Sequence, residues 1–379
     1  MQSIKVVMLD TYGVGMSWLD QFSENVELSE IVTLDGSEGV SISDLMDYEG
    51  WEYLLVFLPE DEPLKQMMQG VLEKCGIPGE RVIYPMDLLS LMDHKAASYC
   101  MFNDTIRKMI AYLENRTASQ YITCTANELS YIGASSDLVI MRKMHLTGEN
   151  WAKDDLIHFQ KLAGRYYHFT EQQTLFCDIG ANIGTSCIFF KKKLDPDVKI
   201  LAFEPMPPIY KCLKINMILN DISPEDYTLV NAGLSNRNDT QTMSYRANNP
   251  GSSNYVYAGA SLYETNILRF DDYLAENQVK KECIKYLWID IEGFEALFCE
   301  GATQTLGAID VPIVMEFTPE ALCEHNTFDI LIDFLNMHYR AYIRLDDETD
   351  TIHPIEELRK YKAREEWVQF DIFLLKQDA

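Results

Sequence analysis

The chain has 379 residues, of which 47% are hydrophobic, and a formal net charge of −27 at pH 7. This much apolar material can form a sizeable core, so the composition excludes an intrinsically disordered chain. The acidic excess argues against nucleic acid or an anionic membrane surface as a partner, because both attract basic patches. The nine cysteines show no C-x-x-C pair and no metal-like spacing, which predicts buried thiols in a reducing compartment.

The N-terminal segment does not resemble a targeting signal. Met1 is followed almost at once by the strand-like stretch IKVVMLD, without a basic region before it. No apolar run approaches the ~18 residues that a membrane span needs. We therefore expect a cytoplasmic protein without membrane insertion, and the sequence leaves open whether the chain forms a homo-oligomer.

Strand and helix patterns alternate through residues 1–86. Strands are predicted over 4–10, 31–36, 53–59 and 81–85, with helical patterns at 15–24 and 64–75. This alternation predicts a small parallel α/β domain of the Rossmann-like kind. Its first turn contains Gly13 and Gly15, but Trp18 stands where a third glycine would complete a dinucleotide fingerprint. Both a bound ligand and a scaffold role stay open for this domain.

Residues 87–153 are interpreted as a helical connector. Apolar residues recur at helical spacing from Asp87 to about Thr117, and the stretch from Tyr121 to Asp155 is irregular. We expect one or two helices here, followed by a segment placed to cap the cleft of a third domain, residues 154–379.

The most informative motif is FCDIGANIG, residues 176–184. An apolar strand leads into Asp178, and glycines then supply the backbone freedom that a tight strand-to-helix turn needs. A second strand, 198–204, ends at Glu204, where an acid can hold ribose hydroxyls. Asn182 replaces the middle glycine of a dinucleotide fingerprint. The pattern therefore fits S-adenosylmethionine, which has an ammonium, a sulfonium and a ribose, better than it fits NAD.

Segments further along the chain strengthen this interpretation. From about Asp154 to the C-terminus the chain resembles the FkbM family of S-adenosylmethionine-dependent O-methyltransferases. The matching segments are CDIGANIG (177–184), AFEP (202–205), VNAGLSN (230–236), GSS (251–253), LRFDDYL (268–274), LWIDIEGFEALFCEGA (287–302) and VMEFTPE (314–320). The resemblance implies a seven-stranded Rossmann-like methyltransferase sheet and methyl transfer to a hydroxyl, often on a sugar or polyketide. Phe270 stands where the family usually has leucine, which is a change in packing.

Cofactor binding is expected at the carboxyl ends of the parallel strands. The turn glycines and Asn182 are assigned to the methionine end, and Asp178 to its ammonium, directly or through water. Glu204 has enough lone pairs to accept from both ribose hydroxyls. Asn231 is placed either to contact the adenine edge or to stabilise a turn. The predicted cofactor-binding residues are Asp178, Gly180, Asn182, Gly184, Glu204 and Asn231.

Catalysis is expected at WIDIEGFE, residues 288–295. Methyl transfer to an alcohol needs a group that removes the hydroxyl proton. Asp290 closes an apolar strand and Glu292 follows two residues later, so alternation places both on one side. Carboxylates crowded in a half-closed cleft repel one another, which raises a pKa and suits a general base. We favour Asp290, then Glu292; alternatively, Glu292 and Glu295 only complement the dipole of the next helix.

An insert after the third strand supplies the predicted acceptor site. Its polar and aromatic side chains suit a carbohydrate, although a plain turn explains them equally well. The predicted substrate-binding residues are Ser252, Ser253, Tyr255 and Glu316. Asp290, Glu292 and Glu316 are also hard oxygen ligands that suit Mg²⁺, but the sequence alone does not favour a metal.

The leading interpretation is an S-adenosylmethionine-dependent O-methyltransferase that acts on a hydroxyl of a sugar or glycan. One alternative is a non-catalytic module that keeps the fold and the ligand. The acids at 178, 204 and 290 argue against it, because decay would have little reason to leave all three. A second alternative is an enzyme dependent on NAD or a sugar nucleotide, with its chemistry in the first domain.

Overall fold

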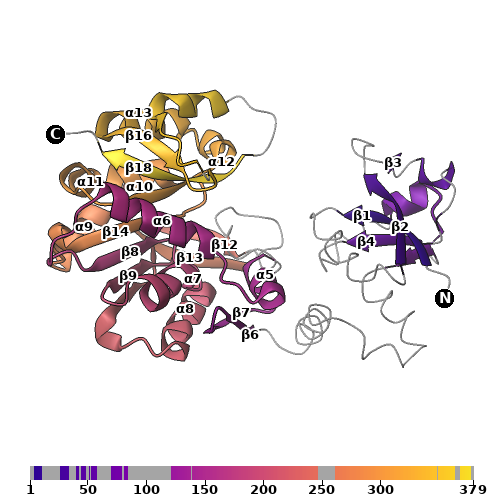
Figure 1. Ribbon diagram of the computed structural model, residues 1–379, viewed down its shortest axis with the longest axis horizontal. Helices are drawn as coiled ribbons and strands as arrows, with labels where there is room; N and C mark the ends of the chain where they lie inside the picture. The colour runs from indigo at the N-terminus through magenta and orange to yellow at the C-terminus, as the bar shows by residue number, and fades with distance from the viewer. Residues whose placement is uncertain are drawn as a thin grey trace. The chain divides into compact units, whose positions relative to one another are not determined.

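The computed structural model divides the chain into two compact units, Met1–Ala118 and Ser119–Ala379 (Figure 1). The residues that it describes are 4–10, 26–33, 40–41, 44–47, 51, 53–57, 70–78, 81–83, 121–137, 139–245, 261–347, 349–362 and 368–376. No helix among these residues is both long enough and apolar enough to cross a membrane.

The first unit contains a five-stranded, wholly parallel sheet. Its strands are β1 (Ile4–Asp10), β2 (Val26–Thr33), β3 (Val40–Ser41), β4 (Tyr53–Phe57) and β5 (Val82–Ile83), in the order β3-β2-β1-β4-β5. Val7 and Leu9 of β1 and Leu54 of β4 are buried against Trp51 and Leu72. This confirms the small parallel sheet at the N-terminus. The turn with Gly13, Gly15 and Trp18 lies outside the described residues.

The second unit is organised around an eight-stranded mixed sheet. Its strands are β8 (Leu175–Ile179), β9 (Lys199–Phe203), β10 (Tyr227–Val230), β14 (Ile284–Ile289), β15 (Ile313–Phe317), β16 (Tyr339–Arg344), β17 (His353–Pro354) and β18 (Phe370–Lys376). Their order is β10-β9-β8-β14-β15-β18-β16-β17, parallel from β10 to β15 and antiparallel beyond. The expected seven strands are thus joined by β17, a two-residue edge strand too short for its sequence to show a period.

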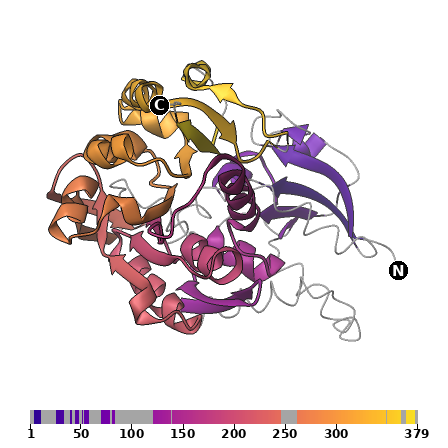
Figure 2. The same ribbon diagram turned by 60° about the vertical axis from the view of Figure 1, so that its left-hand side comes forward.

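Helices cover both faces of this sheet (Figures 1 and 2). The α-helices described in this unit are α5 (Ile140–Thr147), α6 (Lys153–Tyr166), α7 (Thr185–Phe189), α8 (Pro207–Leu219), α9 (Phe270–Glu276), α10 (Glu295–Gly301), α11 (Thr303–Ala308), α12 (Pro319–Glu324) and α13 (Phe328–His338). A π-helical turn, Phe190–Leu194, continues α7. A 3₁₀ helix, Ile355–Tyr361, follows β17.

The side chains of β14 alternate between the two faces of the sheet. Leu287 and Ile289 belong to the core shared with α9, α10, α11 and α13. Tyr286 and Trp288 instead contact the ring of Phe159 on α6, with centroids 5.7 and 5.8 Å away. Because side chains alternate along a strand, the next residue on the α6 side after Trp288 is number 290.

Asp271, in the first turn of α9, has a structural role. Its carboxylate accepts hydrogen bonds from the backbone N–H groups of Gln304 and Thr305, both at 2.9 Å. Those bonds satisfy donors in the first turn of α11, so the aspartate ties two helices together.

A hairpin occupies part of the segment that was expected to be irregular. Its strands, β6 (Tyr121–Ala126) and β7 (Leu129–Ala134), are joined by Asn127 and Glu128, both with positive φ, as a two-residue hairpin turn requires. Asn216 of α8 bonds the backbone of Ile132 with both amide atoms, at 2.7 and 3.0 Å. The hairpin, and with it residues 119–153, therefore belongs to the second unit.

A second, three-stranded sheet lies after β10. Its strands are β11 (Ala232–Leu234), β12 (Asp239–Tyr245) and β13 (Ser261–Leu268), with β12 and β13 antiparallel. This is the predicted insert, but its tip, with Ser252, Ser253 and Tyr255, lies outside the described residues.

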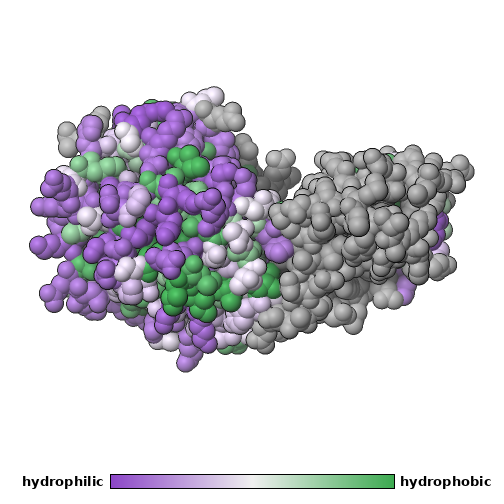
Figure 3. Space-filling model, turned by 60° about the horizontal axis from the view of Figure 1, so that its bottom comes forward, coloured by the Kyte–Doolittle hydropathy of each residue, from purple (hydrophilic) through white to green (hydrophobic). Residues whose placement is uncertain are grey.

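Figure 3 views the molecule from the side on which α8 lies in Figure 1, and there an apolar patch interrupts a largely hydrophilic surface.

Candidate functional site

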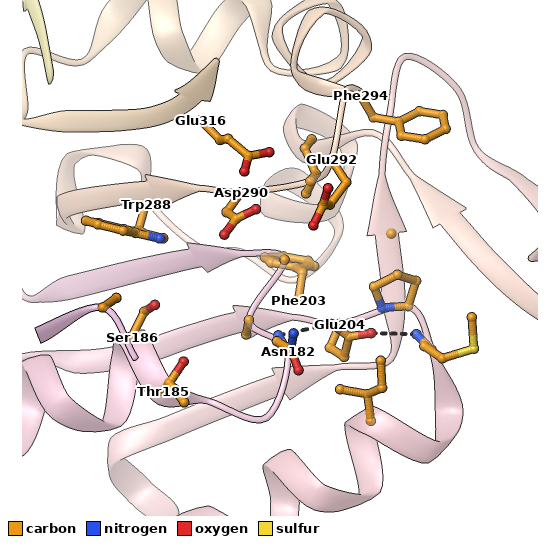
Figure 4. A pocket seen from close by; sticks show the side chains of 18 of the residues that line it. Asn182, Thr185, Ser186, Phe203, Glu204, Trp288, Asp290, Glu292, Phe294 and Glu316 are labelled. Carbon is orange, nitrogen blue, oxygen red and sulfur yellow. Dashed lines mark hydrogen bonds between the residues drawn. The ribbon is translucent and has the colours of Figure 1, made fainter. Parts of the chain in front are cut away.

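A cavity of about 660 Å³ lies at the carboxyl ends of β8, β9, β14 and β15 (Figure 4). Its volume falls within the usual range for small-molecule sites. The three-stranded sheet contributes Gln241, Met243 and Ile267 to the wall, and α5 contributes Ile140 and Lys143. The cavity therefore forms where an open α/β sheet is expected to bind its ligand.

The turn after β8 brings two strand ends together. Gly180 has φ of 90°, and a Cβ there would lie 1.8 Å from the carbonyl oxygen of Asp290. On the other side, the backbone N–H groups of Gly180 and Ala181 donate to the carbonyl of Phe203 at 3.0 and 2.9 Å. Only glycine can stand between β9 and β14 at this distance. The turn thereby sets Glu204 and Asp290 on facing parts of one cavity.

Glu204 is a carboxylate held in place by the backbone. It is 5% exposed, and its two oxygens accept from the N–H groups of Asn182 (3.0 Å) and Met206 (2.8 Å). Burial raises its pKa to about 7, although these two bonds favour the ionised form. A carboxylate has roughly four lone-pair positions, so about two are left for ligand hydroxyls. This donor set suits the predicted ribose contact.

Three other predicted cofactor residues sit just outside the cavity wall. Asp178 is 1% exposed and accepts from the N–H of Cys187 at 3.2 Å, and its Oδ1 has no hydrogen-bond partner. Gly184, with φ of 89°, packs against Leu213 instead. The Asn231 amide donates to the carbonyls of Glu204 and Pro205 (2.8 and 2.9 Å), as the turn-stabilising alternative expected. Their ligand contacts stay predictions.

Asn182 lines the cavity but also serves the turn. It has φ of 50°, which is uncommon for a residue with a Cβ. Its side-chain Oδ1 accepts from the N–H of Ile183 at 2.8 Å, so the side chain stabilises this conformation. The assignment of its side chain to the methionine end of the cofactor stays a prediction.

The end of β14 is shaped by two successive left-handed residues, Glu292 (φ 55°) and Gly293 (φ 94°). Glu295 is fully buried, and its Oε1 accepts from the N–H groups of Ile291 (3.3 Å) and Gly293 (3.2 Å). Glu295 thus stabilises the bend through its hydrogen bonds to the backbone. This is a structural role, as was the alternative in which Glu295 only complements the dipole of the next helix. The bend turns Glu292 back toward Asp290 (Figure 4).

Asp290, Glu292 and Glu316 form a cluster of carboxylates on one side of the cavity. Each offers an oxygen that lies within 4.8 Å of the others. Glu316 is 4% exposed; one oxygen accepts from the Gln369 amide, and its Oε2 has no hydrogen-bond partner. Burial raises the pKa of Asp290 to about 6. Burial and the charge of Asp290 raise the pKa of Glu316 well above its usual range.

The lining of the cavity is strongly acidic. Seven lining residues are Asp or Glu, and Lys143 is the only lysine or arginine that the described residues contribute. Its ammonium lies 4.6 Å from the centre of the Trp151 ring. The cavity therefore favours ligands with positive charge or with hydroxyl donors over anions.

Sequence reasoning missed much of the wall. The unpredicted lining residues include Lys143, Trp151, Asp155, Thr185, Ser186, Met206, Gln241, Met243, Trp288, Phe294 and Asp371. Trp288 carried a usable signal, because it precedes Asp290 by two positions on one strand. Asp371 carried none, because only the antiparallel register of β15 and β18 sets it opposite Glu316.

Comparison with known proteins fits this geometry. Residues 178–343 match the methyltransferase FkbM domain. Methyltransferase sdnD of Sordaria araneosa is 30% identical over 193 residues, covering 41% of this chain and 74% of that protein. The chain belongs to the FkbM family of S-adenosylmethionine-dependent methyltransferases.

Solved structures related to this FkbM-family chain are distant. Methyltransferase FkbM from Methylobacillus flagellatus KT covers 98% of this chain and 90% of its own, with 13% identity and a TM-score of 0.38. M. jannaschii TYW2 in complex with AdoMet covers 68% of this chain and 88% of its own, with 10% identity and a TM-score of 0.33. The matched FkbM domain includes Glu204, Asp290, Glu292 and Glu316, so the family segment carries the cavity's two groups of acids.

Proposed function

We propose that this FkbM-family chain is an O-methyltransferase that transfers a methyl group from S-adenosylmethionine to a hydroxyl of a carbohydrate. The observation that carries the proposal is the division of one cavity into two acidic regions. Glu204, with its backbone donors, lies at one region, and Asp290 with its neighbouring carboxylates lies at the other (Figure 4).

The residues of the first region fit the cofactor. Glu204 would accept from the ribose hydroxyls with the lone pairs that Asn182 and Met206 leave free. Apolar side chains beside it, including Met206 and Ile209, suit the adenine ring. The acidic lining suits the ammonium and sulfonium. When bound, S-adenosylmethionine supplies an activated methyl group for transfer to oxygen.

Asp290 is the general base in this proposal. It lines the cavity at the end of β14, and burial raises its pKa to about 6. Such a carboxylate is mostly ionised near neutral pH and is still basic enough to accept a proton from a hydroxyl as the oxygen is methylated. Glu292 is the second candidate for the same role. The base and the ribose-binding acid are thus different residues on different strands.

Carbohydrate is the proposed acceptor because of the chemistry of the second region. Carboxylates accept hydrogen bonds from several hydroxyls at once, and Asp290, Glu292 and Glu316 are grouped there. Trp288 and Phe294 also line the cavity, on opposite sides of these acids, and aromatic faces suit the C–H faces of a sugar ring (Figure 4).

The test is an assay of the full chain with S-adenosylmethionine labelled on the methyl group. Free sugars, sugar nucleotides and short glycans are the acceptors, and mass spectrometry locates the label. We expect a methyl ether on one hydroxyl, lost in Asp290→Asn. Label found only on nitrogen, sulfur or carbon would overturn the O-methyl assignment. An ether formed only on non-sugar hydroxyls would overturn the carbohydrate assignment.

A further inference from the structure

We propose that Asp290, Glu292 and Glu316 form a binding site for one hard divalent cation of the Mg²⁺ or Ca²⁺ class. Sequence alone did not favour a metal, because the three acids come from β14, the bend after it and β15. The fold brings one oxygen of each within 4.8 Å of the others, and the three carboxylates point toward a shared space (Figure 4).

The burial of Glu316 is a separate observation that points to a missing positive charge. This side chain is 4% exposed, yet its Oε2 has no hydrogen-bond partner, and Figure 4 shows its carboxylate directed toward Asp290. A buried carboxylate without full compensation is expensive, and a charge partner or metal is the usual remedy. The Gln369 amide satisfies only the other oxygen.

Neighbouring acids increase the need for a positive charge beside Glu316. Asp371 of β18 stands directly opposite Glu316 in the antiparallel register, and like charges at such positions repel. Within the described part of the chain, no lysine, arginine or histidine forms an ion pair with Asp290, Glu316 or Asp371. Two positive charges placed among these acids would offset the repulsion, as a divalent cation does.

The ligand atoms select the kind of cation. The cavity lining contributed by the described residues has neither histidine nor cysteine, so a soft or borderline metal such as Zn²⁺ finds only oxygen here. Two ligands on opposite sides of Ca²⁺ stand about 4.6–5.2 Å apart, so any one pair of these oxygens, all within 4.8 Å of one another, can share a Ca²⁺ ion. For Mg²⁺ the corresponding limit is about 4.2 Å, so a pair near the upper bound would have to draw closer.

The role of the cation rests on the proposed function. Three protein ligands leave coordination positions for water or for acceptor hydroxyls on the cavity side. A coordinated hydroxyl has a lowered pKa and a fixed position, both of which help Asp290 to act as its base. The site would then select acceptors with two neighbouring hydroxyls, which can chelate the ion.

Cation binding is tested without cofactor or acceptor, so that it can fail while methyl transfer succeeds. The full chain, freed of metal, is titrated with Mn²⁺ in about 0.15 M salt, which screens binding to exposed acids. The signal of free Mn²⁺ in electron paramagnetic resonance is recorded. We expect one ion per chain, with affinity at least tenfold weaker in Glu316→Gln and in Asp290→Asn. Glu276→Gln, which removes an exposed acid at the end of α9, should bind like the wild type.

Competition then identifies the cation. Displacement of Mn²⁺ by Mg²⁺ or by Ca²⁺ supports the site and shows which of the two it prefers. Circular dichroism of each variant confirms that a lost ion does not reflect a lost fold. No bound ion, or weak binding of several ions that Glu316→Gln and Glu276→Gln alter equally, would overturn the site. Methyl transfer that persists in that case would leave the proposed function intact.

Discussion

Glu204 and Glu316 are both buried glutamates at the ends of parallel strands in one cavity, but their surroundings differ. Glu204 has a backbone N–H on each oxygen. Glu316 has one oxygen without a partner and faces other carboxylates. The exposed fractions of the two side chains are almost equal, 5% and 4%, so burial alone does not distinguish their roles. The hydrogen-bond donors around each carboxylate distinguish the two roles.

A carboxylate that the backbone already holds is preorganised to accept hydrogen bonds from neutral hydroxyls, at little further cost. A carboxylate crowded by like charges requires a proton or a cation. The Glu204 region therefore suits recognition of a ribose, and the Asp290 region suits chemistry at a hydroxyl. Substitutions can alter either region, or the turn that joins them, separately.

Asp290→Asn should change turnover more than any other single substitution in the cavity. Asparagine keeps the size of the side chain but cannot accept a proton, so kcat should fall by roughly 10²–10⁴-fold. Affinity for S-adenosylmethionine, measured by calorimetry, should change by less than about threefold because the ribose acid is untouched. Turnover within tenfold of the wild type would move the base role to Glu292 or to water.

The next effect concerns the turn that joins the two regions. Gly180→Ala would force a Cβ to 1.8 Å from the Asp290 carbonyl oxygen at a φ of 90°. Backbone strain and overpacking together should lower the free energy of unfolding by roughly 2–5 kcal/mol. Urea denaturation measures this loss.

A matched control is Gly164→Ala. This glycine lies on the exposed side of α6, and a Cβ there would meet nothing within 4 Å. The substitution should stabilise the chain by up to about 1 kcal/mol, since alanine favours helix. Equal effects at the two glycines would show that the packing between β8 and β14 is looser than the geometry indicates.

Glu204→Ala should act on binding rather than turnover. Loss of the ribose acceptor is expected to weaken S-adenosylmethionine by roughly 1.5–3 kcal/mol, the range for hydrogen bonds to a charged group. Calorimetric titration of wild type and variant gives the difference directly. If the affinity is unchanged while Asp290→Asn abolishes turnover, Glu204 does not bind the ribose and the proposed separation of cofactor binding from catalysis is wrong.

Most of the second unit's framework was predictable, because its strands are buried and continuous. The apolar runs that became β8, β9 and β14 were predicted to end at Asp178, Glu204 and Asp290, each within about one residue of the observed strand end. The hairpin β6–β7 was missed, since it is held by Asn216 of α8 and by Asn220 just after that helix, and such hydrogen bonds leave no hydrophobic period. Local pattern cannot show a contact between segments some 90 residues apart.

The site was predictable where the chain itself brings residues together. Asp290 and Glu292 follow one strand, β14, and Glu204 follows β9, on the other side of β8. The gathering of Glu316 with Asp371 depends on which strands pair and in which register, and the sequence does not specify either. Sequence also cannot tell a satisfied acid from an unsatisfied one, so it did not show that the hydrogen bonding of Glu204 and Glu316 differs.

The stability of the folded chain should also depend on pH. Burial raises the pKa of Asp178, Glu204 and Glu295 to about 7, against roughly 4 for exposed carboxyl groups. Between these values the folded chain holds more protons than the unfolded chain, so the free energy of unfolding falls as pH rises. In EDTA we expect it to be lower at pH 8 than at pH 5.5, by on the order of 1–3 kcal/mol.

Paired substitutions at pH 8 test whether the surroundings of Glu204 and Glu316 differ in their effect on stability. Glu316→Gln removes a charge from the crowded region, so urea denaturation should show a gain of up to about 1 kcal/mol. Glu204→Gln turns an NH₂ group toward the N–H of Asn182 or Met206, leaving a buried donor unpaired, and should cost roughly 1–3 kcal/mol. Changes of the same sign would mean that the two buried glutamates are alike, and that the backbone donors around Glu204 do not set it apart.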